Sequence, residues 1–163
     1  LMEVVGALGA EMLVLAGVAK NVAAAREILQ KKLASGDARA KWEAMVRAQG
    51  GDPAAGLPVA RHQRVIAARQ TGYVQAIACD QIGYATIALG GGRRVAGDAI
   101  DAAVGFTEPR KVGDSVRSGE PLMIMHYNEE ARAVRAEALV QAAYTIGAEP
   151  TRSRSPLIAA RFE

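Results

Sequence analysis

The sequence predicts an α+β fold in two parts, a helical portion over residues 1–58 and a mixed α+β domain over residues 59–163. Three observations support this prediction. Apolar residues recur at helical spacing through the first part. A linker that contains proline and glycine, residues 51–58, marks the boundary. Residues 111–126 then alternate glycine turns with short apolar strands, which is typical of a β-rich unit.

The composition excludes several classes of protein. Half of the 163 residues are hydrophobic, which favours a packed core over disorder. The net charge of +3 and the aromatic content of 4% are too low to indicate binding to nucleic acid. No apolar run approaches the roughly 18 residues of a membrane span, and the N-terminus lacks the pattern of a signal peptide. We expect a cytoplasmic protein with no membrane or nucleic-acid partner.

Residues 2–19 predict a first helix that is mostly buried. Leu8, Met12 and Leu15 recur at helical spacing, and only two charged residues interrupt the apolar run. The chain opens with the apolar Leu1, and no capping side chain precedes the helix. We therefore expect a fragment of a longer protein, in which the first helices form one layer of a larger domain.

Two further helices are expected before the linker. Asn21 should cap a helix that Gly36 ends, and Asp37 should cap a third helix that ends at Gly50. The residues expected to face the core are Ile28, Leu29 and Leu33 in the second helix and Trp42, Met45 and Val46 in the third.

The second part is expected to begin with two strands around a bend at Thr71-Gly72. A helix over residues 81–89 follows, and the three glycines after it end it. Asn128 should cap a last helix that runs to Gly147. The tail, residues 151–163, is expected to form a solvated terminal strand or arm.

Two strand-and-turn segments, residues 68–78 and 110–126, resemble the two halves of a biotinyl or lipoyl carrier barrel. An insertion from about residue 80 to 105 splits them. A carrier needs a lysine at the hairpin tip, because the prosthetic group is attached to its amine. The tip here is the stretch from Met125 to Asn128, and no lysine follows Lys111. The carrier function is therefore excluded at that position, while the barrel shape remains expected.

The most specific local signal is the glycine-arginine loop, which consists of Gly90, Gly91, Gly92, Arg93 and Arg94. Such a loop could hold phosphate through backbone N–H groups and guanidinium forks. A phosphate loop should open a helix after a strand, however, whereas these glycines follow a helix. A mobile surface loop and a lid or interdomain contact are the other interpretations, and we treat the loop as a candidate lid.

Other polar residues have a structural and a chemical interpretation. Asp98 and Asp101 could act as an acid-base pair or bind a cation, but we expect them to bind the arginines or turn amides. Asp114 is expected to serve the turn after a glycine. His126 could be a general base, but no nucleophile pattern accompanies it, so we expect a structural role. The only cysteine, Cys79, lies in an apolar run and predicts a buried, unreactive thiol.

The sequence shows no Ser/His/Asp array, Walker loop, dinucleotide fingerprint or zinc-ligand spacing. We therefore expect no cofactor and no metal. On its own residues, the chain does not show a complete active site.

Five motifs, taken together and in order, resemble the C-terminal part of the pyrimidine-nucleoside phosphorylase family. The resemblance covers nearly the whole chain and is closer to the bacterial thymidine phosphorylase branch than to the broader pyrimidine enzymes. The motifs are LGAEML (residues 8–13), MVRAQGGD (45–52), TGYVQAI (71–77), ALGGGRRVAGDAIDAAVGFTE (88–108) and KVGDSVRSGEPLMIMH (111–126).

This resemblance implies a homodimeric enzyme that takes phosphate and a pyrimidine nucleoside. It would convert thymidine and phosphate reversibly to thymine and 2-deoxyribose 1-phosphate. Residues 1–58 would be the last helical layer of a large α/β domain, followed by a barrel-sandwich or hammerhead-like α+β domain.

The family's phosphate- and base-binding residues would all precede Leu1, so no catalytic or substrate-binding residue is carried over to this chain. The fragment is expected to be inactive without the missing N-terminal part of the same protein. A non-catalytic, carrier-like binding or scaffold module is the alternative.

Overall fold

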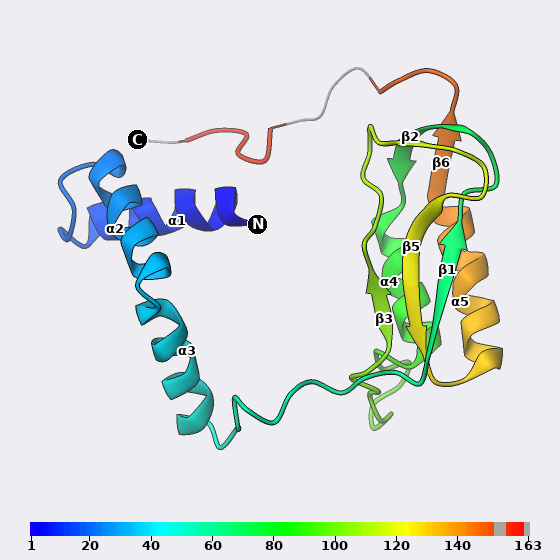
Figure 1. Ribbon diagram of the computed structural model, residues 1–163, viewed down its shortest axis with the longest axis horizontal. Coiled ribbons are helices and arrows are strands. Elements are labelled where there is room, and N and C mark those ends of the chain that lie inside the picture. The colour runs from blue at the N-terminus through cyan, green and yellow to red at the C-terminus, as the bar shows by residue number, and fades with distance from the viewer. Residues whose placement is uncertain (152–155, 162–163) are drawn as a thin grey trace. The chain divides into compact units, whose positions relative to one another are not determined.

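The computed structural model describes residues 1–151 and 156–161 (Figure 1). These residues fold as two compact units. The first contains residues 1–56 together with residues 156–161, and the second contains residues 57–151. Helices and small antiparallel sheets occur in the same chain, which confirms the predicted α+β class.

The first unit is helical. It consists of α1 (Met2–Leu15), α2 (Val22–Ala34) and α3 (Asp37–Ala48). The predicted cap of α2 is confirmed, because Asn21 Oδ1 accepts a hydrogen bond from the Ala24 N–H at 2.9 Å. The predicted cap of α3 is wrong. Gly36 occupies the cap position with a φ of 81°, and the Asp37 carboxylate instead binds Lys32 Nζ at 2.7 Å.

The prediction that the first helix is mostly buried is wrong for this unit. Ala10 is the buried residue of α1, whereas Leu8, Met12 and Leu15 are 62%, 69% and 86% exposed. The reason is that the α2 helix packs on the small-residue face of α1. The opposite, larger apolar face is left uncovered. Leu33, Trp42 and Met45, which were expected to face the core, are also half exposed or more.

The second unit contains two antiparallel sheets of three strands each (Figure 1). Their orders are β1-β5-β3 and β4-β2-β6, and no closed barrel forms among the described residues. The strands are β1 (His62–Ala67), β2 (Gly72–Ile77), β3 (Gly105–Thr107), β4 (Ser115–Val116), β5 (Pro121–Tyr127) and β6 (Tyr144–Gly147).

The two half-motifs seen in the sequence pair with each other. β1, which precedes the first half, pairs with β5 of the second half, with Val65 opposite Ile124. β2 pairs with β4, with Gly72 opposite Val116. The predicted bend at Thr71-Gly72 is confirmed, because β1 ends at Ala67 and β2 begins at Gly72 in the other sheet.

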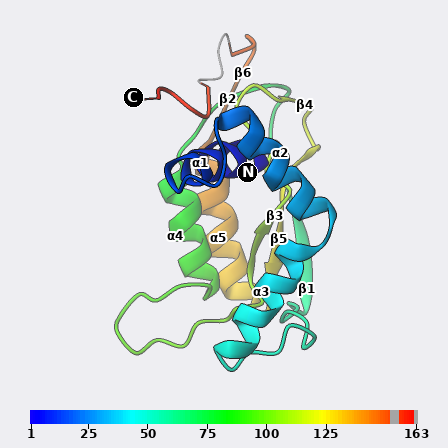
Figure 2. The same cartoon turned by 90° about the vertical axis from the view of Figure 1, so that its left-hand side faces the viewer.

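Two helices, α4 (Cys79–Leu89) and α5 (Glu130–Ala143), pack against each other beside the sheets (Figure 2). The predicted end of α4 is confirmed, since Gly90 closes it in the left-handed region. The core of the unit lies between the helices and strands. Its largest fully buried side chains are Ile66, Val74, Leu122, Met123, Met125 and Val140.

Three expectations for this unit need correction. The last helix ends at Ala143 rather than Gly147, because the β-branched Thr145 and Ile146 pair with β2 as strand β6. Asn128 does not cap α5, whose cap position is Glu129. Cys79 is exposed in the first turn of α4 rather than buried in a strand.

The predicted terminal strand or arm is described only in part. Residues 152–155 and 162–163, which include two of its arginines, lie outside the described residues. Residues 156–161 contain no strand, and Arg161 forms an ion pair with Glu11 of α1, Nε to Oε1 at 2.9 Å.

Candidate functional site

The glycine-arginine loop starts where α4 ends. Gly90 has a φ of 102°, and its N–H donates to the Ile87 carbonyl at 3.0 Å. A Cβ atom at Gly90 would collide with the guanidinium group of Arg132, which lies directly over the glycine. The backbone conformation therefore favours glycine at this position, and a side chain here would displace the Arg132 guanidinium.

The next two glycines lie tightly against α4. A Cβ atom at Gly91 would come within 2.9 Å of Thr86 Cγ2, and one at Gly92 within 2.8 Å of Ile87 Cγ1. The absence of a side chain thus lets the start of the loop pack on the last turn of the helix. In Figure 2 the chain then swings away from the end of α4 before it returns to β3.

Asp98 closes the exposed part of the loop. Its Oδ2 atom accepts hydrogen bonds from the backbone N–H groups of Arg94 at 3.0 Å and Val95 at 3.1 Å. Arg93 Nε donates to the backbone carbonyl of Asp98 at 3.3 Å. This confirms the interpretation that Asp98 binds turn amides of the arginine segment.

Asp101 fixes the return of the chain. Its N–H donates to the Gly90 carbonyl at 2.9 Å, its Oδ1 accepts from the Ala103 N–H at 3.0 Å, and its Oδ2 accepts from Asn128 Nδ2 at 2.7 Å. The Asn128 amide, the Ala103 N–H and the nearby Arg132 hold the pKa of the Asp101 carboxyl below its usual range. Asp101 therefore serves structure, as expected.

Asn128 was expected to cap α5, but its side chain binds two other partners. Its Oδ1 accepts from the Arg61 N–H at 2.7 Å, while its Nδ2 binds Asp101. It thus connects the chain before β1, the end of β5 and the base of the loop. A side-chain amide can serve as donor and acceptor at once, and this bridge could not be read from a capping pattern.

An open groove lies beside the loop, between α4 and α5. Its volume is about 1240 Å³. Tyr84 and Ile87 of α4 and Leu139 of α5 form an apolar wall. We name this cavity the arginine groove, because four arginines line it: Arg93, Arg94, Arg132 and Arg135.

Only two of these arginines, Arg93 and Arg94, were candidate residues from the sequence. Arg132 and Arg135 stand three residues apart on α5, a spacing that places them on one helix face. That spacing was visible in the sequence. The antiparallel packing of α4 and α5, which brings this face beside the loop, was not.

The other candidate residues have structural partners. His126 Nε2 lies 2.8 Å from Thr107 Oγ1, across the β5–β3 pair. Asp114 Oδ2 accepts from the Lys111 N–H at 2.8 Å, which confirms its role in the turn. The histidine contact fits the structural role that was expected.

A hydrogen-bonded network that was not predicted from the sequence connects β1 to α5. Arg64 binds Glu130 at 2.5 Å and Glu137 at 3.2 Å, and donates to the Tyr127 hydroxyl at 3.2 Å. These hydrogen bonds raise the pKa of the Arg64 guanidinium and lower the pKa of the Glu130 carboxyl. The residues come from β1, β5 and α5, so only the tertiary fold brings them together.

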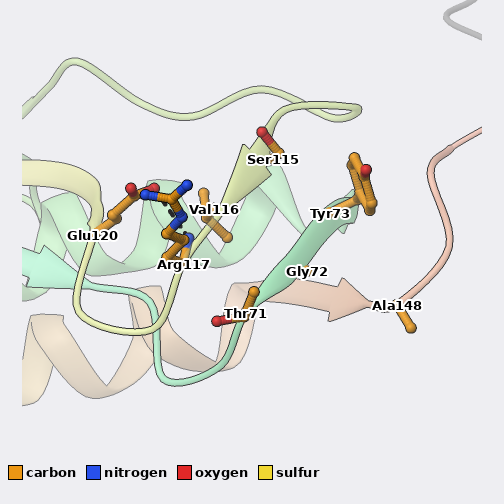
Figure 3. A pocket seen from close by; sticks show the side chains of 8 residues that line it. All are labelled: Thr71, Gly72, Tyr73, Ser115, Val116, Arg117, Glu120 and Ala148. Atoms are coloured by element: carbon orange, nitrogen blue, oxygen red, sulfur yellow. Dashed lines mark hydrogen bonds between the residues drawn. The ribbon is translucent and has the colours of Figure 1, made fainter.

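A second, smaller cavity of about 610 Å³ lies where β2 and β4 meet (Figure 3). Tyr73 and Ser115 are paired across the two strands. On the turn after β4, Glu120 Oε2 accepts from the Arg117 N–H at 3.0 Å. Glu120 is thus bound to its own turn, and the residues that line the cavity show no hydrogen-bonded pair of nucleophile and base.

The described residues contain neither a metal-ligand cluster nor a membrane-spanning helix. No three His, Cys, Asp or Glu side chains in residues 1–151 and 156–161 gather closely enough to hold a metal ion. Within the same residues, no helix combines the length and apolar character needed to cross a membrane.

Known proteins that resemble this chain share one family of names. Residues 73–147 match the pyrimidine nucleoside phosphorylase C-terminal domain. Proteins named thymidine phosphorylase from Burkholderia orbicola (strain MC0-3) and Burkholderia cenocepacia (strain HI2424) are 40% identical over 151 residues. One from Burkholderia lata has the same identity over the same length.

The alignments cover a larger fraction of this chain than of its relatives. The alignment covers 89% of this chain but 34% of each of the three relatives. The chain thus spans about a third of the length of the curated relatives it matches. The family match contains α4, the glycine-arginine loop, α5, strands β3 to β6 and all of β2 except Gly72. Residues 73–147 of this chain are therefore similar to the pyrimidine nucleoside phosphorylase C-terminal domain.

Proposed function

We propose that this chain is the C-terminal part of a thymidine phosphorylase and is inactive alone. The observation that carries the proposal is the 40% identity over 151 residues to proteins named thymidine phosphorylase. The complete enzyme would bind phosphate and thymidine in the cytoplasm, and we propose that it acts as a homodimer.

The proposed reaction is a pentosyl transfer. A phosphate oxygen forms a bond to C1′ of the deoxyribose, and the bond from C1′ to the pyrimidine nitrogen breaks. The electron pair of that bond leaves with thymine, which takes up a proton, and 2-deoxyribose 1-phosphate remains. Such a reaction needs a preorganised site that holds both reactants and the developing charge. We assign none of its catalytic residues to this chain.

The uncovered face of α1 supports the need for a further part. Leu1, Val5, Leu8, Met12 and Leu15 follow one another at steps of three or four residues, and each is at least 48% exposed. Complete burial of a leucine side chain contributes roughly 1.5–3 kcal/mol, so covering this face is strongly favoured. The relatives are about three times as long as the matched segment. We propose that their additional residues have a counterpart that covers this face.

We propose that the glycine-arginine loop contacts that counterpart as a lid. Its base is fixed by Gly90 and Asp101, whereas Arg93 and Arg94 are exposed and extend beyond the helix. A loop with a fixed base and exposed cations suits a contact that forms when two domains close. Arginine forks can then bind carboxylates or phosphate across the closing surface.

The first test is an activity assay. Purified chain incubated with thymidine and phosphate is expected to release no thymine above background, measured by the absorbance change of the free base. Robust turnover by these residues alone would refute the assignment of catalysis to a further part.

The second test measures association. The N-terminal two thirds of the Burkholderia orbicola enzyme, produced separately, is expected to bind this chain in analytical ultracentrifugation. Val5→Asp should abolish binding because it places a charge on the α1 face. Val134→Asp, a matched control at a valine of similar exposure on α5, should bind like the parent. Equal effects of the two substitutions would contradict the proposed contact.

A further inference from the structure

The arginine groove has unused binding capacity. Among the described residues, the guanidinium groups of Arg94 and Arg135 have no hydrogen-bond or ion-pair partner. Arg93 uses only its Nε atom, which binds a backbone carbonyl. Arg132 pairs with Glu129, Nε to Oε2 at 2.8 Å, and is held over Gly90. Four cations therefore border one cavity, and most of their donors point to no protein acceptor.

Acidic groups offset only part of this charge. Asp98 is the one acidic residue in the lining, and its Oδ2 atom is already bound by the Arg94 and Val95 N–H groups. The groove thus offers a positive field and planar donor forks beside a wall that includes Tyr84, whose side chain is 57% exposed. Guanidinium forks match phosphate oxygens in pairs, and an exposed aromatic ring can stack on a base.

The helix dipole explains the position of only two of the four arginines. Cations near the C-terminus of a helix are stabilised by its dipole, which would explain Arg93 and Arg94 after α4. Arg132 and Arg135 lie in the N-terminal half of α5, where the dipole favours anions instead. Their presence beside the loop is therefore not explained by helix electrostatics.

We propose that the arginine groove binds a phosphate monoester carried on a nucleoside-sized group. The phosphate would lie between Arg94 and Arg135, and the apolar group would lie along the wall formed by Tyr84 and Leu139. A volume of about 1240 Å³ accommodates a ligand of nucleotide size. The site shares two arginines with the proposed lid, but ligand binding here requires neither loop closure nor phosphorolysis.

The test is an NMR titration of the ¹⁵N-labelled 163-residue chain at low ionic strength, with adenosine 5′-monophosphate as the probe. A purine nucleotide keeps this result separate from any turnover of pyrimidine nucleosides. Inorganic phosphate tests the phosphate group alone, and adenosine tests the base and sugar alone. A hexaglutamate peptide tests whether the groove takes an acidic polypeptide instead.

The expected result is saturable shifts of the α5 and loop amides with the nucleotide. Inorganic phosphate should bind more weakly, and adenosine weakest of all. Arg94→Gln combined with Arg135→Gln should weaken nucleotide binding about tenfold or more, and the lysine pair should restore it only in part. The matched control, Arg69→Gln with Arg117→Gln, removes the same charge from arginines outside the groove and should leave the affinity unchanged.

Three results would overturn the proposal. One is the absence of saturable nucleotide shifts in the groove. Another is equal weakening by the control pair, which would show a non-specific charge effect. The third is binding of hexaglutamate without binding of the nucleotide, which would assign the groove to an acidic polypeptide. Dispersed amide spectra of each variant establish that it is folded.

Discussion

The contact between Gly90 and Arg132 gives a quantitative test of how the loop is anchored. Alanine in the left-handed region costs about 1–2 kcal/mol relative to glycine. Gly90→Ala should pay this cost and also displace the Arg132 guanidinium, which lies where the new Cβ would be. The displaced arginine would lose its pair with Glu129. Both side chains of that pair are substantially exposed, so the loss adds at most about 1 kcal/mol.

Gly97 supplies a matched control. Its φ of 96° is close to that of Gly90, but no atom lies within 4 Å of the position of a Cβ. Gly97→Ala should therefore show the backbone cost alone. We expect Gly90→Ala to destabilise the second unit by about 0.5–1 kcal/mol more than Gly97→Ala does, and Arg132→Ala should remove this difference.

The assay is urea unfolding followed through NMR signals of α4 and α5 amides. The only tryptophan, Trp42, lies in the first unit and does not report on the second. The reasoning would be refuted by equal costs for the two glycine substitutions, or by a difference that persists when Arg132 is alanine.

Three further predictions concern the second unit. Met125→Ala, at a fully buried core position, should lower the free energy of unfolding by about 2–5 kcal/mol; a loss under 1 kcal/mol in urea titrations would contradict the packing. Asn128→Ala should cost about 1–3 kcal/mol and raise the pKa of Asp101, whose depressed value contributes stability above its unfolded pKa that is lost as pH falls through the folded pKa; an unchanged ¹³C titration of Asp101 would contradict the bridge. Burial raises the pKa of Tyr144 to about 12, so its neutral form contributes stability that is present below the unfolded pKa near 10 and is lost as pH rises through about 12; ultraviolet titration in which every tyrosine ionises near pH 10 would contradict its burial.

The sequence predicted elements whose signals are local. The Asn21 cap, the bend at Thr71-Gly72 and the end of α4 each depend on residues within one turn, and the structure confirms all three. Asp98 and Asp114 were also assigned correctly, because an aspartate beside a glycine turn binds amides only a few residues away.

Features that depend on long-range pairing were missed. The helical pattern of α5 continues through residues 144–147. These residues nevertheless pair with β2 as an edge strand and adopt strand geometry. Asparagine is common at helix caps, yet the partners of Asn128 are Arg61 and Asp101, far away in sequence. A local sequence pattern does not predict hydrogen-bond partners that are distant in sequence.

The predicted burial of α1 was wrong for a different reason. Its apolar spacing identified the helix correctly and indicated burial, but Leu8 and Met12 are exposed. A hydrophobic pattern records which face is suited to a partner and not whether the described chain supplies one. The same limit applies to the groove, since Arg132 and Arg135 become neighbours of the loop only through helix packing.

The most direct test of the proposed identity is a chimera. The 151-residue segment of the Burkholderia orbicola thymidine phosphorylase that matches this chain is replaced by the aligned residues of this chain, and phosphorolysis of thymidine is measured. We predict a folded protein with turnover of thymidine, and a lower kcat/KM when Arg93 and Arg94 are both alanine. A chimera that folds and binds phosphate but cleaves no thymidine would contradict the proposal.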